Sequence, residues 1–366
     1  MATHPSCGEG PEARLMVRMS IRPMYAHVGC SKTGTSSLQA GLWTSVERLE
    51  SADVGVPLVG RSAHRRRLLD PLGWQPARGF VGDWDDAALR QTRMRLAKAR
   101  GNRVLVSNED LVELPTRGVD RFLELTADAG LDLHLVVTLR DWAQQIPSEY
   151  QQFLRHGMQE PYLDFIRQVR DREGRWGDHF WRRQDPVDIM RRWGAVATGR
   201  ITFVVVPSYS ADPGGVFRLM NEALGLDPSL IARPDHAVNT SHGVVEAEVF
   251  RRINAALPEA FGDYSEAYRQ LVRRPLTTGV LPTEASARLR LPVSELAWVQ
   301  ERGRSAVRQI RASGCKVLGD LDTLIPTESR TSPYTPVDDA DVARAAVETF
   351  ARLAERARRR RGKASA

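Results

Sequence analysis

Four short apolar runs along the chain predict β-strands. They consist mostly of β-branched or large apolar residues between polar or turn-forming positions, at residues 24–29, 103–107, 133–139 and 201–206. Between them, apolar residues recur with helical spacing at residues 85–99, 119–129 and 185–193. Strands that alternate with helices predict an α/β fold, in which a mostly parallel sheet is flanked by helices on both faces. Ligands of such sheets bind at the carboxyl ends of the strands.

The pattern becomes more helical after residue 206. Residues 243–257, 293–313 and 338–361 predict helices, and the short apolar segment 316–321 is ambiguous. The chain contains no internal repeat and no low-complexity linker that would mark a firm boundary. We therefore expect a flexible leader over residues 1–21, one α/β domain over 22–325 and a helical extension with a basic tail over 326–366.

The segment 25–39 combines a strand, a polar loop and the start of a helix. It reads Tyr-Ala-His-Val-Gly-Cys-Ser-Lys-Thr-Gly-Thr-Ser-Ser-Leu-Gln. Gly34 lets the backbone turn, Lys32 supplies a positive charge, and the following hydroxyl residues stand at a helix N-terminus, which attracts anions. An ordinary glycine turn with a Ser/Thr cap is the alternative. The pattern favours a phosphate-binding loop, with the candidate ligands Lys32, Thr33, Gly34, Thr35, Ser36 and Ser37.

The order of residues in this loop differs from that of the common nucleotide-binding loop. In the common loop a lysine follows the second glycine, whereas here Lys32 precedes Gly34. The order Lys-Thr-Gly-Thr-Ser-Ser-Leu-Gln after His-Val-Gly resembles the 5′-phosphosulfate loop of sulfotransferases that use 3′-phosphoadenosine-5′-phosphosulfate (PAPS). The resemblance implies a P-loop-like sulfotransferase fold, with PAPS as co-substrate.

A second motif stands where that family contacts the 3′-phosphate. Arg140 ends the apolar run 133–139, and Ser148 follows eight positions later, which resembles the family's strand-end arginine and following serine. Pro147 suits the first position of a helix, so Ser148 is expected in a first turn with free N–H groups. Arg140 can hold the same phosphate through two parallel N–H bonds. The alternative role for Arg140 is an ion pair with a neighbouring carboxylate such as Asp141.

Weaker similarities and several departures accompany these motifs. Stretches at 106–111, 180–185, 239–243 and 249–254 resemble bacterial, especially actinobacterial, sulfotransferase-like proteins. Ser31 stands where a proline often precedes the lysine, and Trp142 stands where proline often follows Arg-Asp. The C-terminal Lys-Gly-Arg or Arg-Lys-Gly loop that closes over the 3′-phosphate in animal enzymes is missing from the sequence.

The resemblance implies transfer of a sulfuryl group from PAPS to a hydroxyl or amine of a small-molecule or carbohydrate acceptor, by in-line displacement and without a metal. Lys32 would neutralise charge on the leaving oxygen. Glu109 follows the strand 103–107 and is a candidate base, because burial could raise the pKa of its carboxyl group. A surface or helix-capping acid is the alternative. His64 is the rival base, with a solvated histidine as its alternative. His27, inside a strand, is expected to be a packed residue.

Composition agrees with a globular protein, at 42% hydrophobic and 27% charged residues. Three scattered cysteines are too few for a disulfide framework or a zinc site. No apolar run reaches the length of a membrane span or of a signal peptide core, so we expect a cytoplasmic protein without a membrane partner. Nothing in the sequence indicates the oligomeric state.

A net charge of +7 raises two further hypotheses about function. Arginine clusters at 65–67 and 356–361 would suit a non-enzymatic nucleic-acid-binding protein, but no nucleic-acid recognition motif accompanies them. An ATP- or GTP-dependent phosphotransferase with an atypical loop is the other alternative; it lacks the Gly-Lys-Ser/Thr order and a clear magnesium-binding aspartate. A multiply anionic donor accounts for much of the charge, so no specific nucleic-acid partner is expected.

Overall fold

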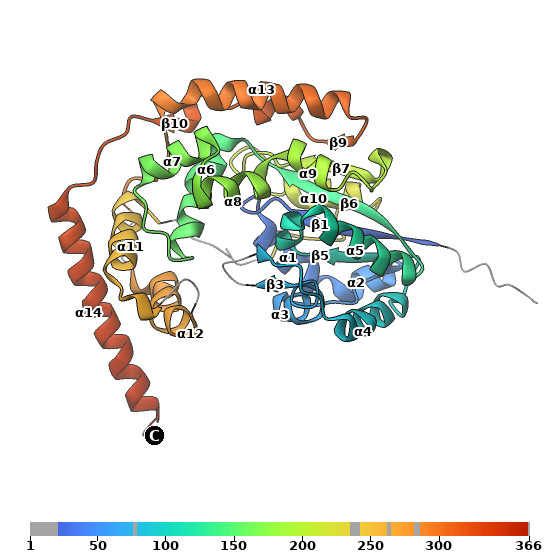
Figure 1. The fold of residues 1–366 in the computed structure, drawn as a ribbon, viewed down its shortest axis with the longest axis horizontal. Coiled ribbons are helices and arrows are strands. Elements are labelled where there is room, and N and C mark those ends of the chain that lie inside the picture. Colours follow the sequence, from blue (N-terminus) through green and yellow to red (C-terminus); the bar gives the residue numbers. More distant parts are fainter. Residues whose placement is uncertain (1–20, 76–78, 235–241, 262–264, 282–285, 365–366) are drawn as a thin grey trace, which may run out of the picture.

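The protein is described here by a computed structural model that covers residues 21–75, 79–234, 242–261, 265–281 and 286–364. Most of the expected leader and most of the stretch 239–243 lie outside these residues. A six-stranded parallel sheet with the order β2-β5-β1-β6-β7-β9 forms the centre (Figure 1). Its strands are β1 (Arg22–Gly29), β2 (Val54–Gly55), β5 (Arg103–Ser107), β6 (Leu131–Leu139), β7 (Ile201–Val205) and β9 (Lys316–Leu318).

The predicted α/β fold with a mostly parallel sheet is confirmed. The four predicted strands correspond to β1, β5, β6 and β7, and the ambiguous segment 316–321 contributes the edge strand β9. Strand β2 was not predicted, because two residues are too few to show a periodic pattern. Two small pairs lie outside the sheet: the antiparallel β3 (Trp74–Gln75) and β4 (Gly79–Phe80), and the parallel β8 (Leu291–Pro292) and β10 (Thr331–Ser332).

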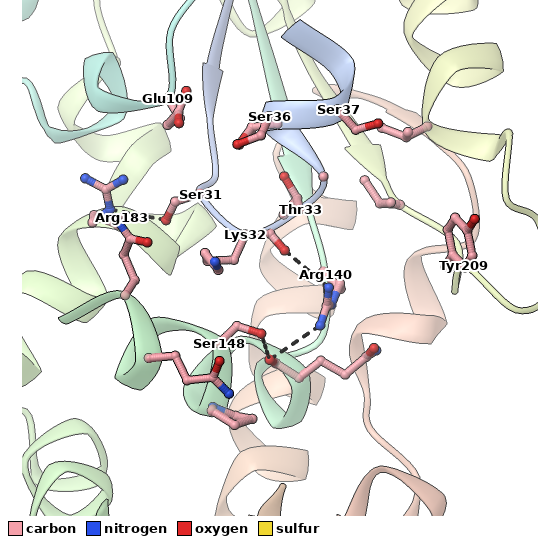
Figure 2. A pocket seen from close by; sticks show the side chains of 18 of the residues that line it. Ser31, Lys32, Thr33, Ser36, Ser37, Glu109, Arg140, Ser148, Arg183 and Tyr209 are labelled. Atoms are coloured by element: carbon pink, nitrogen blue, oxygen red, sulfur yellow. Dashed lines mark hydrogen bonds between the residues drawn. The ribbon is translucent and has the colours of Figure 1, made fainter. Parts of the chain in front are cut away.

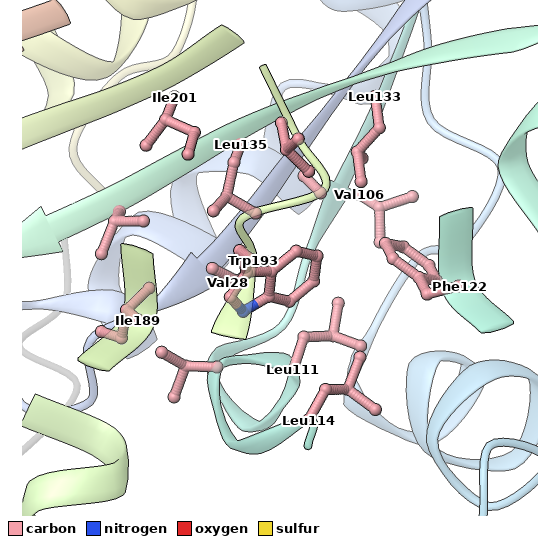
Figure 3. Close-up of a cluster of buried hydrophobic side chains, with 14 of the residues drawn as sticks. Val28, Val106, Leu111, Leu114, Phe122, Leu133, Leu135, Ile189, Trp193 and Ile201 are labelled. Carbon is pink, nitrogen blue, oxygen red and sulfur yellow. The ribbon is translucent and has the colours of Figure 1, made fainter. Parts of the chain in front are cut away.

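Helices cover both faces of the sheet because its strands are apolar on both faces. Leu135 and Val137 of β6 join one buried cluster, and the intervening Val136 joins another. Figure 3 shows the first cluster, where the Trp193 ring packs edge-on against Phe122 with centroids 6.1 Å apart. The helices on that face are α4 (Asp86–Ala97), α5 (Thr116–Asp128) and α9 (Pro186–Arg192); the other face carries α1 (Thr35–Thr44), α2 (Val46–Ser51) and α10 (Gly215–Ala223).

A helical lobe encloses a third buried cluster beside the sheet. Its helices are α6 (Trp142–Leu154), α7 (Tyr162–Asp171), α8 (Gly174–Gln184), α11 (Val244–Ala256), α12 (Glu266–Tyr268) and α14 (Asp339–Ala364), with part of α13 (Leu296–Ala312). In Figure 1, α14 runs alongside α11, and its Val342 and Ala345 belong to the cluster. Within the described residues, no helix has both the length and the apolar character needed to cross a membrane.

Candidate active site

The loop between β1 and α1 turns through two left-handed residues. Lys32 has φ 62° and Gly34 has φ 88°, and Gly34 is the N-cap of α1 without a side-chain cap bond among the described residues. A Cβ at Gly34 would meet no atom within 4 Å, so the backbone conformation, and not space, favours glycine there. Thr35, Ser36 and Ser37 form the first turn of α1, whose N–H groups have no acceptor within the helix. The loop therefore has the geometry of an anion-binding helix N-terminus.

This loop faces a cavity of about 960 Å³ (Figure 2). Twelve cationic side chains and three carboxylates are among the described residues that line it. The cavity brings together nearly all of the residues predicted from sequence, namely Lys32, Thr33, Gly34, Thr35, Ser36, Ser37, Glu109, Arg140 and Ser148. His64 is the exception, since it does not line the cavity.

Lys32 lies half-buried at the centre of this cavity. Burial lowers its pKa to about 8, with a further lowering by Arg155 that Glu149 opposes. The ammonium group is therefore still mostly protonated at pH 7. The backbone oxygen of Lys32 accepts a hydrogen bond of 3.2 Å from Nη1 of Arg140, which joins the loop to the end of β6.

Helix α6 begins earlier than the sequence predicts. Asp141 caps it by accepting from the backbone N–H of Gln144, so the helix starts at Trp142 and Pro147 lies inside it. The expectation that Ser148 stands in a first turn is wrong, because an aspartate cap six residues before Pro147 sets the helix start. Ser148 faces the cavity and offers only its hydroxyl, which donates to the Gln144 carbonyl at 2.8 Å.

The Arg140 guanidinium belongs to a cluster that the sequence did not reveal. Burial lowers its pKa to about 10, Asp141 opposes this, and Arg330 and Arg288 lower it further. Arg288 precedes β8 and Arg330 precedes β10, so the pairing of these two strands brings them to the same cavity. The Nε atom of Arg140 is buried without a hydrogen-bond partner among the described residues. Asp141 binds Gln144, so the expected alternative of an Arg140–Asp141 ion pair does not form.

Glu109 begins the short 3₁₀ helix η2 (Glu109–Glu113) at the carboxyl end of β5. Its carboxylate accepts a hydrogen bond from the Gln39 side chain. Burial raises the pKa of Glu109, but Arg61, a backbone N–H, Gln39 and Arg183 together lower it below the ordinary value. The expectation of a raised pKa is therefore wrong, because this carboxylate is surrounded by donors and cations. Glu109 is ionised at neutral pH and faces the cavity.

Two histidines lie behind the cavity wall. His64 is buried, its Nδ1 donates to the Gly60 carbonyl at 3.1 Å, and its Nε2 accepts from the Ser107 backbone N–H at 3.4 Å. Burial lowers its pKa, so the ring is neutral, and the solvated alternative for His64 is wrong. His27 is buried as expected, with Nδ1 2.8 Å from the Ser107 hydroxyl, and burial lowers its pKa to about 4. Nε2 of His27 lies 3.3 Å from the Thr138 hydroxyl. Both ring nitrogens of each histidine therefore have partners inside the protein.

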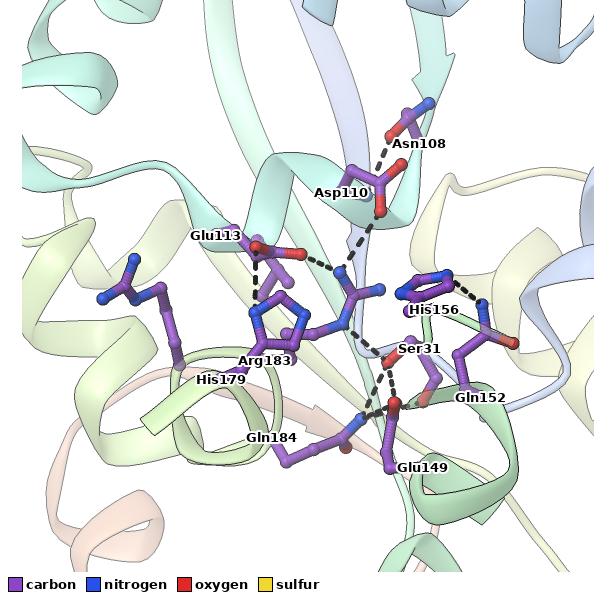
Figure 4. A network of polar contacts seen from close by, with 12 residues as sticks. Ser31, Asn108, Asp110, Glu113, Glu149, Gln152, His156, His179, Arg183 and Gln184 are labelled. Carbon is purple, nitrogen blue, oxygen red and sulfur yellow. Dashed lines mark hydrogen bonds and ion pairs between the residues drawn. The ribbon is translucent and has the colours of Figure 1, made fainter. Parts of the chain in front are cut away.

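A buried polar network holds the loop from below (Figure 4). The Ser31 hydroxyl donates to Glu149 and accepts from Nε of Arg183 at 3.2 Å. The same Arg183 forms ion pairs with Asp110, at 3.2 Å, and with the buried Glu113. The Ser31 side chain therefore ties the loop to α6 and α8 and, through Arg183, to η2.

Trp142, which stands where proline often follows Arg-Asp in the sulfotransferases that the sequence resembles, is also explained by its contacts. Its indole N–H donates to the Gln184 carbonyl at 3.1 Å, and its ring packs edge-on against Trp181 with centroids 5.0 Å apart. At the first position of α6 it joins this helix to α8. Sequence reasoning gave no role to Arg183, Glu149 or Gln184, because isolated polar residues at helical positions carry no spacing signal.

The fold is similar to that in the crystal structure of a sulfotransferase from Alicyclobacillus acidocaldarius, with a TM-score of 0.39 and 19% sequence identity. The match covers 68% of this chain and 99% of that chain. No protein-family model and no curated protein matches the sequence.

Proposed function

We propose that this protein is a sulfotransferase that moves the sulfuryl group of PAPS to a hydroxyl or amine of a small-molecule or carbohydrate acceptor. One observation carries the proposal: the loop with Lys32 and the separate cluster around Arg140 line one cavity. The loop with Lys32 would hold the 5′-phosphosulfate, and Arg140 with Ser148 would hold the 3′-phosphate. Arg288 and Arg330 would add the contacts that the missing C-terminal loop provides in animal enzymes.

The donor's charge distribution favours PAPS over ATP. ATP carries its phosphates in one chain, which a single loop can bind, whereas PAPS carries a second anion on the ribose. The Arg140 cluster supplies cations for that second anion, and the unpaired Nε of Arg140 offers a buried donor to it. A site for ATP would leave this cluster without a counter-charge.

The reaction would be an in-line displacement at sulfur. The acceptor oxygen forms a bond to sulfur while the bond between sulfur and the bridging oxygen breaks, and that oxygen leaves on the 5′-phosphate with the electron pair. Lys32 would neutralise the negative charge that develops on this oxygen, helped by the N–H groups at the start of α1. Because the pKa of Lys32 lies at about 8, its ammonium can also donate a proton there.

Glu109 is the candidate base of this scheme. It would accept the proton that the acceptor loses as the new oxygen–sulfur bond forms. Its lowered pKa keeps it ionised and able to orient the acceptor hydroxyl, although it weakens the carboxylate as a base. His64 is not proposed for this step, because both ring nitrogens have partners inside the protein.

Thermal unfolding with adenosine 3′,5′-bisphosphate (PAP), with ATP and magnesium, and with buffer alone tests the proposal. A ligand at about one hundred times its Kd stabilises the native state by about 2.7 kcal/mol, so PAP should raise the Tm selectively. Equal protection by ATP and magnesium would count against the proposal. With a radiolabelled donor, Glu109→Gln should lose turnover and keep PAP affinity; unchanged turnover would exclude Glu109 as the base.

A further inference from the structure

The cavity contains cations that the proposed donor does not use. Figure 2 shows Arg140 and Tyr209 on one side of Lys32, and Glu109 and Arg183 on the other. PAPS carries about four negative charges, for which Lys32, Arg140, Arg288 and Arg330 supply four cations. Other arginines still line the cavity, among them Arg61, Arg155 and Arg273. The question is which anion these side chains face.

Arg155 is the least compensated of these cations. Its side chain is half-buried and has neither an ion-pair nor a hydrogen-bond partner among the described residues, and its Nε atom is fully buried. Burial and the neighbouring Arg273 both lower its pKa, and no carboxylate opposes them. The C-terminus of α6 offers only partial negative charge to this residue. A cation withdrawn from water without a counter-charge is costly, which indicates an absent anionic partner.

The position of Arg155 separates it from the residues proposed for the 3′-phosphate. Ser148, Gln151, Gln152 and Arg155 all line the cavity, as residues three, four and seven positions apart on one face of α6 do. Seven residues of helix span about 10 Å, so Arg155 lies about two turns beyond Ser148. It is nevertheless close enough to Lys32 to lower the pKa of that lysine more than Arg140 does. An anion on Arg155 would therefore lie beside the reacting end of the donor and away from its 3′-phosphate.

A second segment contributes cations to the same place. The short helix at Arg269–Arg273 follows α12, and both of its terminal arginines line the cavity. Arg269 is paired with Glu266 at 2.7 Å, and Arg273 lies near enough to Arg155 to lower the pKa of that arginine. Two neighbouring arginines from separate helices that line one cavity give the planar, multiple donors that oxyanions bind.

We infer that Arg155 and Arg273 form an anion subsite for the acceptor. The acceptor then carries a carboxylate, sulfate or phosphate group in addition to the hydroxyl or amine that attacks sulfur. The inference rests on the proposed function, because it takes the remaining part of the cavity to be the acceptor site. It narrows the acceptor class from any small hydroxyl compound to acidic compounds such as uronic acids, sulfated sugars or phosphorylated sugars.

Matched acceptor pairs test this inference on the full chain saturated with PAP. The pairs are p-nitrophenyl glucuronide and glucoside, glucose 6-sulfate and glucose, and glucose 6-phosphate and glucose, with binding measured by calorimetry. Each pair differs at C6, so it separates carboxylate, sulfate and phosphate as the source of the charge. We expect at least one anionic member to bind about tenfold or more tightly than its neutral partner, and Arg155→Met to remove that difference.

Controls separate this inference from the proposed function. Arg155→Met should leave the Kd of PAP within about twofold, since independent sites contribute additively, and Arg155→Lys should keep part of the preference. Arg95→Met removes an exposed arginine of α4 outside the cavity and should change nothing. Failure of wild-type protein to bind PAP would defeat the proposed function itself. With PAP bound, equal binding of both members of every pair, or binding by neither, overturns the inference. The inference is also overturned if Arg155→Met loses as much affinity for PAP as Lys32→Met does.

Discussion

The two proposed phosphate sites of the cavity are built in opposite ways. The loop around Lys32 is one continuous segment, and it offers backbone N–H groups, hydroxyls and a single cation at the start of α1. The site around Arg140 is assembled from three segments that are far apart in sequence, and it offers long charged side chains. A continuous site depends on local backbone conformation, whereas an assembled one depends on the packing of the whole helical lobe.

The electrostatic surroundings of the two sites also differ. Lys32 has the carboxylates Glu149 and Glu109 near it, and both raise its pKa against the effect of burial. Arg140 has Asp141 near it, but the other charged neighbours, Arg330 and Arg288, repel it. Mutual repulsion is relieved when an anion binds, so the Arg140 cluster should gain more from a phosphate than from any protein partner. Three substitutions and one pH titration test this contrast, and they follow in order of decreasing expected effect.

Loss of the Arg183 guanidinium would test whether the loop around Lys32 depends on the buried polar network for its stability. Arg183→Met leaves Glu113 and Asp110 without their cation and removes one of the two donors to the Ser31 hydroxyl; the other is the Gln184 amide at 2.9 Å. We expect the free energy of unfolding to fall by about 3–5 kcal/mol, as when one partner of a buried ion pair is removed. Urea unfolding measures it, with the exposed neighbour Arg182→Met as the control. A midpoint equal to that of the control would show that the loop stands without the network.

Removal of the Arg140 side chain should affect the affinities for PAP and for AMP differently. PAP and AMP share the 5′-phosphate, and only PAP carries the 3′-phosphate. Arg140→Met should therefore weaken PAP by about 10- to 100-fold, the value of a charge-assisted hydrogen bond, and AMP by less than about twofold. Lys32→Met should weaken both ligands alike. Calorimetric titration of both ligands provides the test, and an equal loss for PAP and AMP in Arg140→Met would contradict the assignment of this arginine.

The pH dependence of PAP binding should report on Lys32. Its pKa of about 8 means that the ammonium is present below pH 8 and is lost as the pH rises through that value. Phosphate carries its full charge above pH 7, so only the protein titrates in this range. The affinity for PAP should fall by up to about fivefold between pH 8 and pH 9. Lys32→Arg keeps its charge throughout and should give a flat profile; a sloping profile in this variant would assign the titration to another group.

Ser148→Ala should have the smallest effect. The Ser148 hydroxyl already donates to the Gln144 carbonyl at 2.8 Å, so binding a phosphate exchanges one hydrogen bond for another. We expect the Kd of PAP to rise by about two- to fivefold. Ser51→Ala is a matched control outside the cavity, because its hydroxyl also donates at 2.8 Å to the carbonyl four residues before it. A loss as large as that of Arg140→Met would instead make Ser148 a principal ligand.

Much of the fold and part of the candidate site could be predicted from the sequence. The strand and helix periods placed β1, β5, β6 and β7, and a lysine and a glycine beside three hydroxyl residues marked the loop. These features are local, since each is set by residues within one element. The start of α6 was predicted wrongly because Pro147 and the Asp141 cap compete as local signals, and the cap prevails.

The sequence by itself determined the four strands β1, β5, β6 and β7, the candidate anion-binding loop and the strand-end position of Arg140. The tertiary structure alone decided that Arg288 and Arg330 join Arg140, that Arg155 and Arg273 share a cavity wall, and that His64 is buried behind it. It also decided that the pKa of Glu109 is lowered. The physical reason is that periodicity and capping act over a few residues, whereas burial and charge depend on which distant segments pack together.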